Sequence, residues 1–214
     1  MDTEQEELEA LQTWWKENGK AIVAGLVIGL GGVFGWTTWQ SRAEATAERV
    51  SVVYQSMVDM AAADDHLEAL QRVEQIITEH PDSEYAALSA LLGAKSALAA
   101  ERGEDAKRLL DWVIANGTRA EVRDVARMRS AQLLLDAGKR DASLAVLANI
   151  DTLAFAAAVE ELRGDIFVDD GQSDAAAKAY RAALDSDSMT SGIRAGVEMK
   201  LDDLGQREGF EQSQ

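Results

Sequence analysis

Two histidines and three pairs of neighbouring aspartates are the residues of this chain that could support a metal site or catalysis. His66 and His80 stand apart, and neither belongs to a set of ligands at helical spacing that would complete a metal site. Adjacent residues of a helix do not face each other, so a catalytic pair of carboxylates is not expected. We interpret all of them as solvated helix ends and turns; the acidic pairs are Asp64–Asp65, Asp169–Asp170 and Asp202–Asp203.

The remaining sequence carries no motif of catalysis. It has no P-loop, dinucleotide-binding loop, nucleophile elbow or EF-hand loop, and it has no cysteine. The formal net charge of −17 excludes the backbone of a nucleic acid as a partner, because a polyanion is repelled. We therefore expect no enzyme activity, no metal and no cofactor. Function should instead depend on surfaces that bind other proteins or a membrane.

One stretch near the N-terminus, Ala21–Trp39, is apolar, and no charged residue occurs from Ala21 through Ser41. As a helix, Ala21–Trp39 reaches about 28 Å, close to the ~30 Å hydrocarbon core of a bilayer. Its five glycines favour a membrane helix over a buried helix of a soluble core, because each costs a soluble helix about 1 kcal/mol. We predict a transmembrane helix over residues 21–41, with interfacial tryptophans on both sides: Trp14, Trp15, Trp36 and Trp39.

Four of the glycines fall into two pairs with a spacing of four residues, Gly25 with Gly29 and Gly31 with Gly35. Small residues at this spacing share one helix face and allow a partner helix to approach closely. We predict a lateral packing face at these glycines, although glycines that serve no partner are an open alternative. Residues 1–20 form an acidic tail, which we interpret either as a short interfacial helix or as a frayed end.

From residue 42 to the C-terminus, the sequence predicts helices joined by short connections. The expected pairs are 84–101 with 104–116, 119–137 with 140–149, and 154–169 with 172–186, followed by a last helix near 190–203. Gly103, Gly138 and Gly171 stand between the two helices of each pair, 35 and 33 residues apart. A period of this length indicates a helical repeat array. The turn after Gly103 is expected to be about two residues shorter, with Ala106, Leu110 and Val113 in the positions that follow it.

The last pair carries the most informative pattern. A small residue, an aromatic, a turn glycine, a small residue, an aromatic and a small residue follow each other at Gly164, Phe167, Gly171, Ala176, Tyr180 and Ala183. This pattern resembles the tetratricopeptide signature, in which small residues let two helices cross closely and aromatics fill the groove between them. Together with the predicted span, the resemblance implies an all-α fold: one transmembrane helix followed by a degenerate tetratricopeptide-like superhelix of helical hairpins.

In tetratricopeptide arrays the first helix of each pair lines a concave face. Transfer of these positions predicts an acidic binding face with apolar patches, made of Met128, Gln132, Leu135, Asp136, Glu161, Asp165, Val168 and Asp169. Such a face repels a carboxylate and favours basic or apolar extended segments. A solvated face that binds nothing is the alternative.

The order of these features resembles the YfgM family of ancillary subunits of the bacterial SecYEG translocon, over nearly the whole chain. The sequence Thr37-Thr38 departs from the family, because a basic residue after Trp36 would have helped to orient the span. The most specific matches are Glu17-Asn18-Gly19-Lys20-Ala21, Gly35-Trp36 with Trp39, and Glu161-Leu162-Arg163-Gly164-Asp165.

The resemblance implies a single-pass protein of the bacterial inner membrane, with residues 1–20 in the cytoplasm and residues 42–214 in the periplasm. It also implies association with SecYEG and with the periplasmic chaperone PpiD, contact with translocating polypeptides, and assistance in the export and handover of emerging chains. Flanking charges do not give this orientation, because Lys16 and Lys20 before the span balance Arg42 and Arg49 after it. Two alternatives remain: a membrane-anchored scaffold of another cell-envelope complex, and a cleaved periplasmic regulator.

Overall fold

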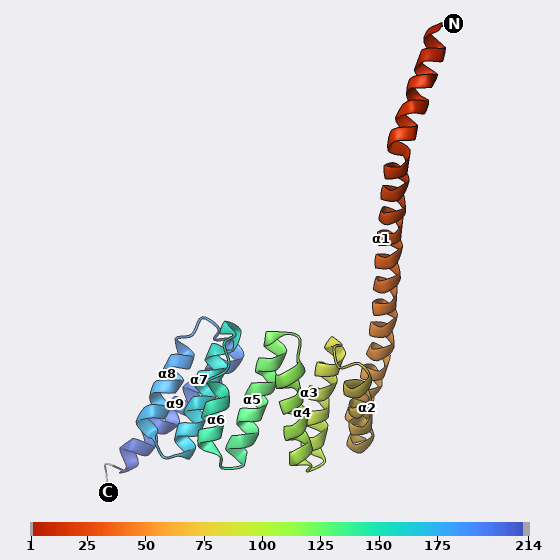
Figure 1. Ribbon diagram of the computed structural model, residues 1–214. Coiled ribbons are helices and arrows are strands. Elements are labelled where there is room, and N and C mark those ends of the chain that lie inside the picture. The colour runs from red at the N-terminus through yellow and green to blue at the C-terminus, as the bar shows by residue number, and fades with distance from the viewer. Residues whose placement is uncertain (1, 212–214) are drawn as a thin grey trace. The chain divides into compact units, whose positions relative to one another are not determined.

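The computed structural model describes the backbone of residues 2–211 and the side chains of residues 14–16, 18–20, 25, 28–37, 48 and 50–205. The described residues form α-helices and one short 3-10 helix, with no strand among them (Figure 1). The helical hairpins expected from the sequence are present, with ends shifted by a few residues. In chain order the elements are α1 (Asp2–Ala62), α2 (His66–Glu79), α3 (Glu84–Ala99), α4 (Gly103–Asn116), α5 (Ala120–Asp136), α6 (Arg140–Leu147), η1 (Leu153–Phe155), α7 (Ala156–Asp169), α8 (Ser173–Leu184) and α9 (Ser191–Glu211).

The chain divides into two compact units, residues 1–49 and residues 50–214. In the first unit, large apolar side chains of α1 are exposed, including Ile28 at 74% and Phe34 at 72%. Trp14, Trp15 and Trp36 are also exposed, whereas the side chain of Trp39 lies outside the described residues. An added Cβ atom would meet nothing within 4 Å at any of the four glycines of the predicted packing face, Gly25, Gly29, Gly31 and Gly35.

Within the described residues, no helix is both long and apolar enough to cross a membrane. The predicted span of residues 21–41 contains side chains outside that description, at positions 21–24, 26–27 and 38–41. The transmembrane helix therefore stays a prediction.

The second unit is organised by four turns in which one residue adopts a left-handed backbone. These residues are Asp64, Glu101, Gly138 and Gly171, with φ of 62°, 57°, 71° and 71°, at spacings of 37, 37 and 33 residues. At Gly138 the amide nitrogen donates to the carbonyl of Leu135, and the next amide donates to Leu134, both at 2.8 Å. This is the Schellman arrangement, and it satisfies carbonyls at the end of a helix that would otherwise lack a partner.

The prediction that Gly103 lies in the turn is therefore wrong. Gly103 is the first residue of α4, and Glu101 occupies the left-handed position. The turn is not shorter than the others. Counted from the left-handed residue, the fifth, ninth and twelfth positions match in all four hairpins, although the twelfth position after Gly138 lies beyond the end of α6. They are buried, apart from the half-buried Ile150: Ala69, Val73 and Ile76; Ala106, Leu110 and Val113; Ser143, Leu147 and Ile150; Ala176, Tyr180 and Ala183.

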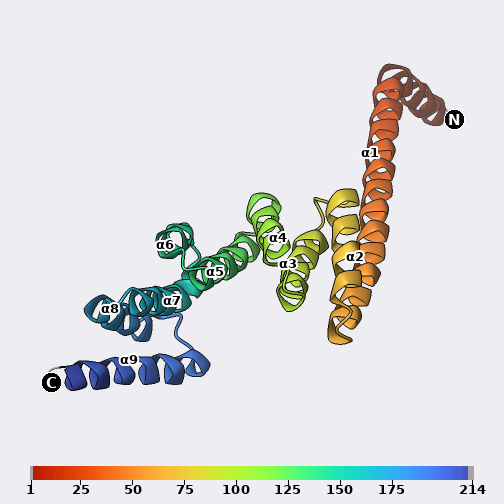
Figure 2. The ribbon, with the colours of Figure 1, turned by 90° about the horizontal axis from the view of Figure 1, so that it is seen from below.

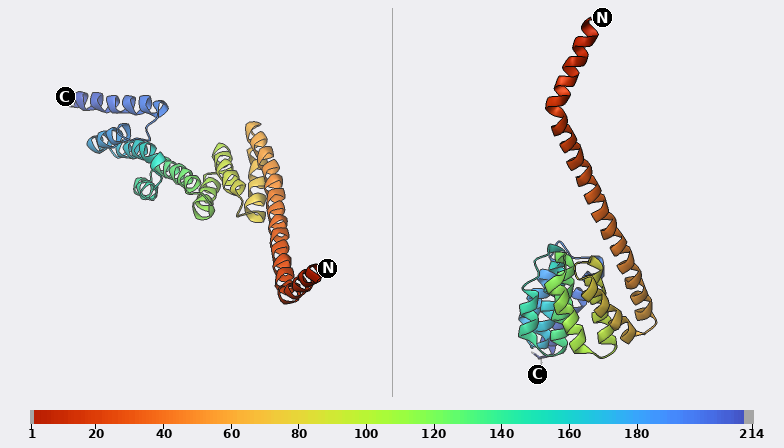
Figure 3. Two further views of the ribbon diagram at one scale, coloured as in Figure 1. Left: turned by 90° about the horizontal axis from the view of Figure 1, so that it is seen from above. Right: turned by 45° about the vertical axis from the view of Figure 1, so that its right-hand side comes forward.

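Each hairpin packs against the next, so that α2 contacts α3, α4 contacts α5, α6 contacts α7 and α8 contacts α9 (Figures 2 and 3). Three apolar clusters fill the interfaces. The first joins Val50 and Met57 of α1 to side chains of α2, α3 and α4. The second lies between α5, α6 and α7, and the third lies between α7, α8 and α9. The described core of residues 50–214 is thus a row of helix-to-helix contacts, as expected of a repeat array.

Candidate functional site

No group of three or more His, Asp or Glu side chains in the described part of the chain is arranged to hold a metal ion. His66 is the first residue of α2, and its Nδ1 atom is buried without a hydrogen-bond partner, so it is more enclosed than the turn histidine expected. His80 follows the last residue of α2. The candidate functional site is the surface that the predicted concave positions mark.

The structure places the predicted concave positions of α5 and α7 in different surroundings. Gln132 and Asp136 of α5 are exposed and line a pocket of about 270 Å³ together with residues of α3 and α4. Met128 and Leu135 are half-buried against the apolar cluster between α5, α6 and α7. Their apolar side chains therefore serve the core of the array and do not line this pocket.

Three of the four positions predicted on α7, Asp165, Val168 and Asp169, line a second pocket of about 300 Å³, which α8 and α9 also line. Val168 contributes to the apolar cluster beside this pocket. Asp169 lines the pocket and also accepts a hydrogen bond from Nε of Arg140, the first residue of α6, at 2.5 Å. The acidic end of α7 is thus tied to the preceding hairpin.

Lys200 of α9 is the partner of the two other predicted acidic positions, and the sequence pattern did not reveal it. Its Nζ atom lies 2.8 Å from Oε1 of Glu161 and 2.8 Å from Oδ2 of Asp165. The hydroxyl of Tyr180 donates to the other carboxylate oxygen of Asp165 at 2.7 Å. Three elements, α7, α8 and α9, therefore meet at one polar cluster.

Burial lowers the pKa of Lys200, but hydrogen bonds to Asp165 and Glu161 outweigh it and raise the pKa above its ordinary value. The ammonium group also lies 5.9 Å from the centre of the Tyr180 ring, within the range of a cation–π contact. Lys200 therefore stays charged at neutral pH. A basic partner segment would have to displace it to reach these two acids.

The pocket between α3 and α5 brings together residues that the tetratricopeptide positions did not single out. Lys95 and Leu98 come from α3, and Arg129 comes from α5. Arg129 donates to the backbone carbonyl of Leu91 at 3.2 Å. The one signal in the sequence was the helical spacing of Leu91, Lys95 and Leu98, which places a lysine between leucines on one face.

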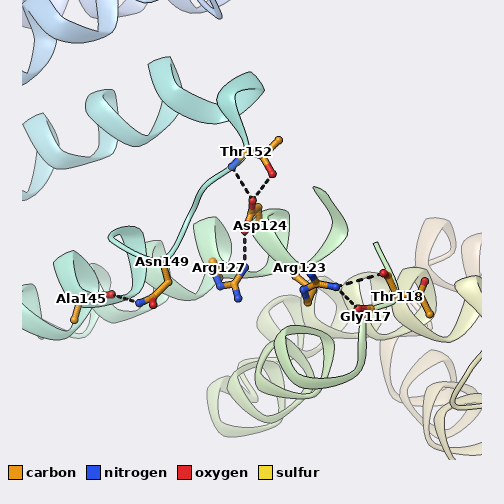
Figure 4. A network of polar contacts seen from close by, with 8 residues as sticks. All are labelled: Gly117, Thr118, Arg123, Asp124, Arg127, Ala145, Asn149 and Thr152. Carbon is orange, nitrogen blue, oxygen red and sulfur yellow. Dashed lines mark hydrogen bonds and ion pairs between the residues drawn. The ribbon is translucent and has the colours of Figure 1, made fainter. Parts of the chain in front are cut away.

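A buried carboxylate fixes the connection between α6 and α7 (Figure 4). Asp124 of α5 is 2% exposed and accepts hydrogen bonds from the hydroxyl and the backbone amide of Thr152. Arg127 donates to its other oxygen at 2.6 Å. Burial acts to raise the pKa of Asp124, but these hydrogen bonds outweigh it and hold the pKa below its ordinary value.

Comparison with known proteins places this arrangement in a family. Residues 12–206 match the family described as a tetratricopeptide repeat-like domain. The ancillary SecYEG translocon subunit of Neisseria gonorrhoeae is 31% identical over 205 residues, which cover 94% of this chain and 97% of that protein. The proteins of the same name from Escherichia coli and Haemophilus influenzae are 28% and 27% identical, over 95% and 94% of this chain and 97% of each relative. The chain therefore belongs to the tetratricopeptide repeat-like family of ancillary SecYEG translocon subunits.

Proposed function

We propose that the chain is a non-catalytic ancillary subunit of the SecYEG translocon, anchored in the bacterial inner membrane by residues 21–41. The observation that carries the proposal is similarity along nearly the full length of both chains to relatives named ancillary SecYEG translocon subunits. The family match begins at residue 12 and so includes residues 21–41 as well as the repeats, which supports a shared anchor and not only a shared repeat fold.

The anchor is further supported by residues of the first unit. No charge interrupts residues 21–41, and Ile28, Val33 and Phe34 are more than half exposed on α1. Exposed apolar side chains of this size are costly in water and are stabilised in a bilayer. We propose that Gly25, Gly29, Gly31 and Gly35 form the face on which a helix of the translocon or of a membrane-anchored chaperone such as PpiD packs.

The second unit supplies binding surfaces for the periplasmic side. We propose that residues 42–214 contact PpiD and translocating polypeptides and assist the handover of emerging chains. The two open pockets along α3, α5 and α7 support a binding role, because a repeat array offers extended surfaces rather than a closed cavity.

Affinity purification of the full-length chain from detergent-solubilised membranes tests this function. SecYEG is expected to co-purify with the natural chain. It should be lost when residues 21–41 are replaced by an unrelated single span, which keeps the anchor but removes the glycines. Co-purification of a different envelope complex without SecYEG would support the scaffold alternative instead.

The absence of natural cysteines makes the orientation directly measurable. Single cysteines placed at Gln5 and at the exposed Lys178 can be labelled in intact spheroplasts with a membrane-impermeant maleimide. Labelling at Lys178→Cys and not at Gln5→Cys is expected for a cytoplasmic tail and a periplasmic repeat unit. The reverse pattern would contradict the orientation, and labelling of a soluble, shortened product would indicate a cleaved regulator.

A further inference from the structure

The pocket between α3 and α5 has an apolar floor with an exposed apolar side chain at its edge. Ala94 and Leu110 are buried in the floor, and Leu133 is half-buried beside them. Leu98 remains 46% exposed at the rim. The pocket volume of about 270 Å³ accommodates a large aliphatic or aromatic side chain together with adjoining backbone.

Two cations line this pocket without a carboxylate partner among the described side chains. Lys95 and Arg129 are both exposed, and the hydrogen bond that Arg129 donates goes to a backbone carbonyl. Acidic residues outnumber basic ones in this chain by 38 to 21, and other cations such as Arg108, Arg140 and Lys200 do contact carboxylates. The pocket is therefore complementary to a group that brings its own negative charge.

The lining also contains acceptors. Asp136 and Gln132 lie on the same face of α5 as Arg129, seven and three residues further along the helix. Their oxygen atoms suit the N–H donors of a polypeptide backbone that continues past the pocket. A terminal carboxylate would be repelled by Asp136, whereas an acidic side chain can turn towards the cations while its backbone runs on.

We propose that this pocket binds an internal, extended segment of a partner polypeptide that presents an apolar side chain next to an aspartate or glutamate. The apolar side chain enters the space between Ala94, Leu98 and Leu133, and the carboxylate pairs with Lys95 and Arg129. This inference rests on the proposed contact with polypeptides and specifies their chemistry, and it is tested apart from the association with SecYEG, because peptide binding is measured without the translocon.

The test uses the full-length chain in detergent and an array of random 12-residue peptides, acetylated at the N-terminus and amidated at the C-terminus. The captured peptides are expected to share an apolar residue within two positions of an acidic one. Their Kd, measured by fluorescence anisotropy, should rise at least tenfold for Lys95→Glu/Arg129→Glu, because like charges then oppose each other. Leu98→Asn should raise the Kd of the same peptides about tenfold.

A matched control makes the same charge change elsewhere. Lys139, just before α6, and Lys178 of α8 are exposed and do not line the pocket, so Lys139→Glu/Lys178→Glu should change the Kd less than twofold. The pocket variants alter exposed side chains, and thermal unfolding by circular dichroism verifies that they are folded.

Several results would overturn the proposal: no capture from the amidated array, capture of basic peptides, capture that requires a free C-terminal carboxylate, or Kd values that the pocket variants do not change. Self-association of the chain that Lys95→Glu/Arg129→Glu abolishes would assign the pocket to a second copy instead.

Discussion

The ring of Tyr180 on α8 lies where a side chain at Gly164 on α7 would have to be. A Cβ atom added at Gly164 would lie 2.2 Å from Cε1 of Tyr180 and 2.4 Å from Cδ1. Tyr180 is 2% exposed and belongs to the apolar cluster between α7, α8 and α9, so the ring has little room to move. The crossing of these two helices therefore requires glycine at position 164.

The variant Gly164→Ala should consequently lower the free energy of unfolding by at least the ~1–3 kcal/mol typical of an overpacked core. Chemical denaturation of the natural chain and the variant measures the change. The control Gly196→Ala lies in α9 with open space around it, and it should raise stability by roughly 0.5–1 kcal/mol through helix propensity alone. Equal stability of Gly164→Ala and the natural chain would contradict this close packing.

The left-handed backbone of Glu101 is strained, whereas that of Gly138 and Gly171 is not, because a side chain disfavours this region by about 1–2 kcal/mol. We expect Glu101→Gly to raise the free energy of unfolding by up to about 1 kcal/mol, and Gly171→Ala to lower it by about as much. Urea denaturation gives both values. Gly103→Ala is the control, because Gly103 begins α4 with open space and a negative φ, and it should not destabilise the chain.

Asp124 makes stability depend on pH. Its pKa in the folded protein is lowered, so its contribution is present above the ordinary aspartate pKa of about 3.9 and is lost as pH falls through the folded value. The Asp124→Asn variant should be less stable than the natural chain at pH 7, and the difference should shrink below pH 4. Thermal unfolding between pH 3 and pH 7 tests this, and a difference that grows in acid would contradict it.

Lys200 neutralises Glu161 and Asp165, and its removal leaves two carboxylates without their cation. We expect Lys200→Met to cost about 0.5–1 kcal/mol of stability at low salt, and less at 1 M salt because salt screens partly exposed charges. If the acidic part of α7 binds basic segments, this variant should also capture more lysine-rich peptides than the natural chain. Lys178→Met is the control, and unchanged capture would argue against a basic ligand at these acids.

Much of the fold followed from the sequence because it depends on local signals. The apolar periodicity and the glycines at 138 and 171 predicted the hairpins to within a few residues. The small residue at 164 and the aromatic at 180 were also predicted as helix-crossing positions. The left-handed backbone of Asp64 and Glu101 was not predicted, because no glycine marks either position.

The candidate surface was less predictable. Repeat positions alone placed Met128 and Leu135 on an open face, but packing against α6 and α7 uses both side chains in the core. They also left Glu161 and Asp165 as free acids, because Lys200 lies far along the chain and reaches them only when α9 packs on the last hairpin.

By itself the sequence determined the helical repeat class, the resemblance to translocon subunits and the predicted anchor at residues 21–41, since periodicity, turn residues and uncharged length are read along the chain. Only the tertiary structure decided which charges are neutralised and which stay available. Pairing of charges depends on distances between side chains from different helices. Lys200 is thereby bound to its own acids, whereas Lys95 and Arg129 face an open pocket.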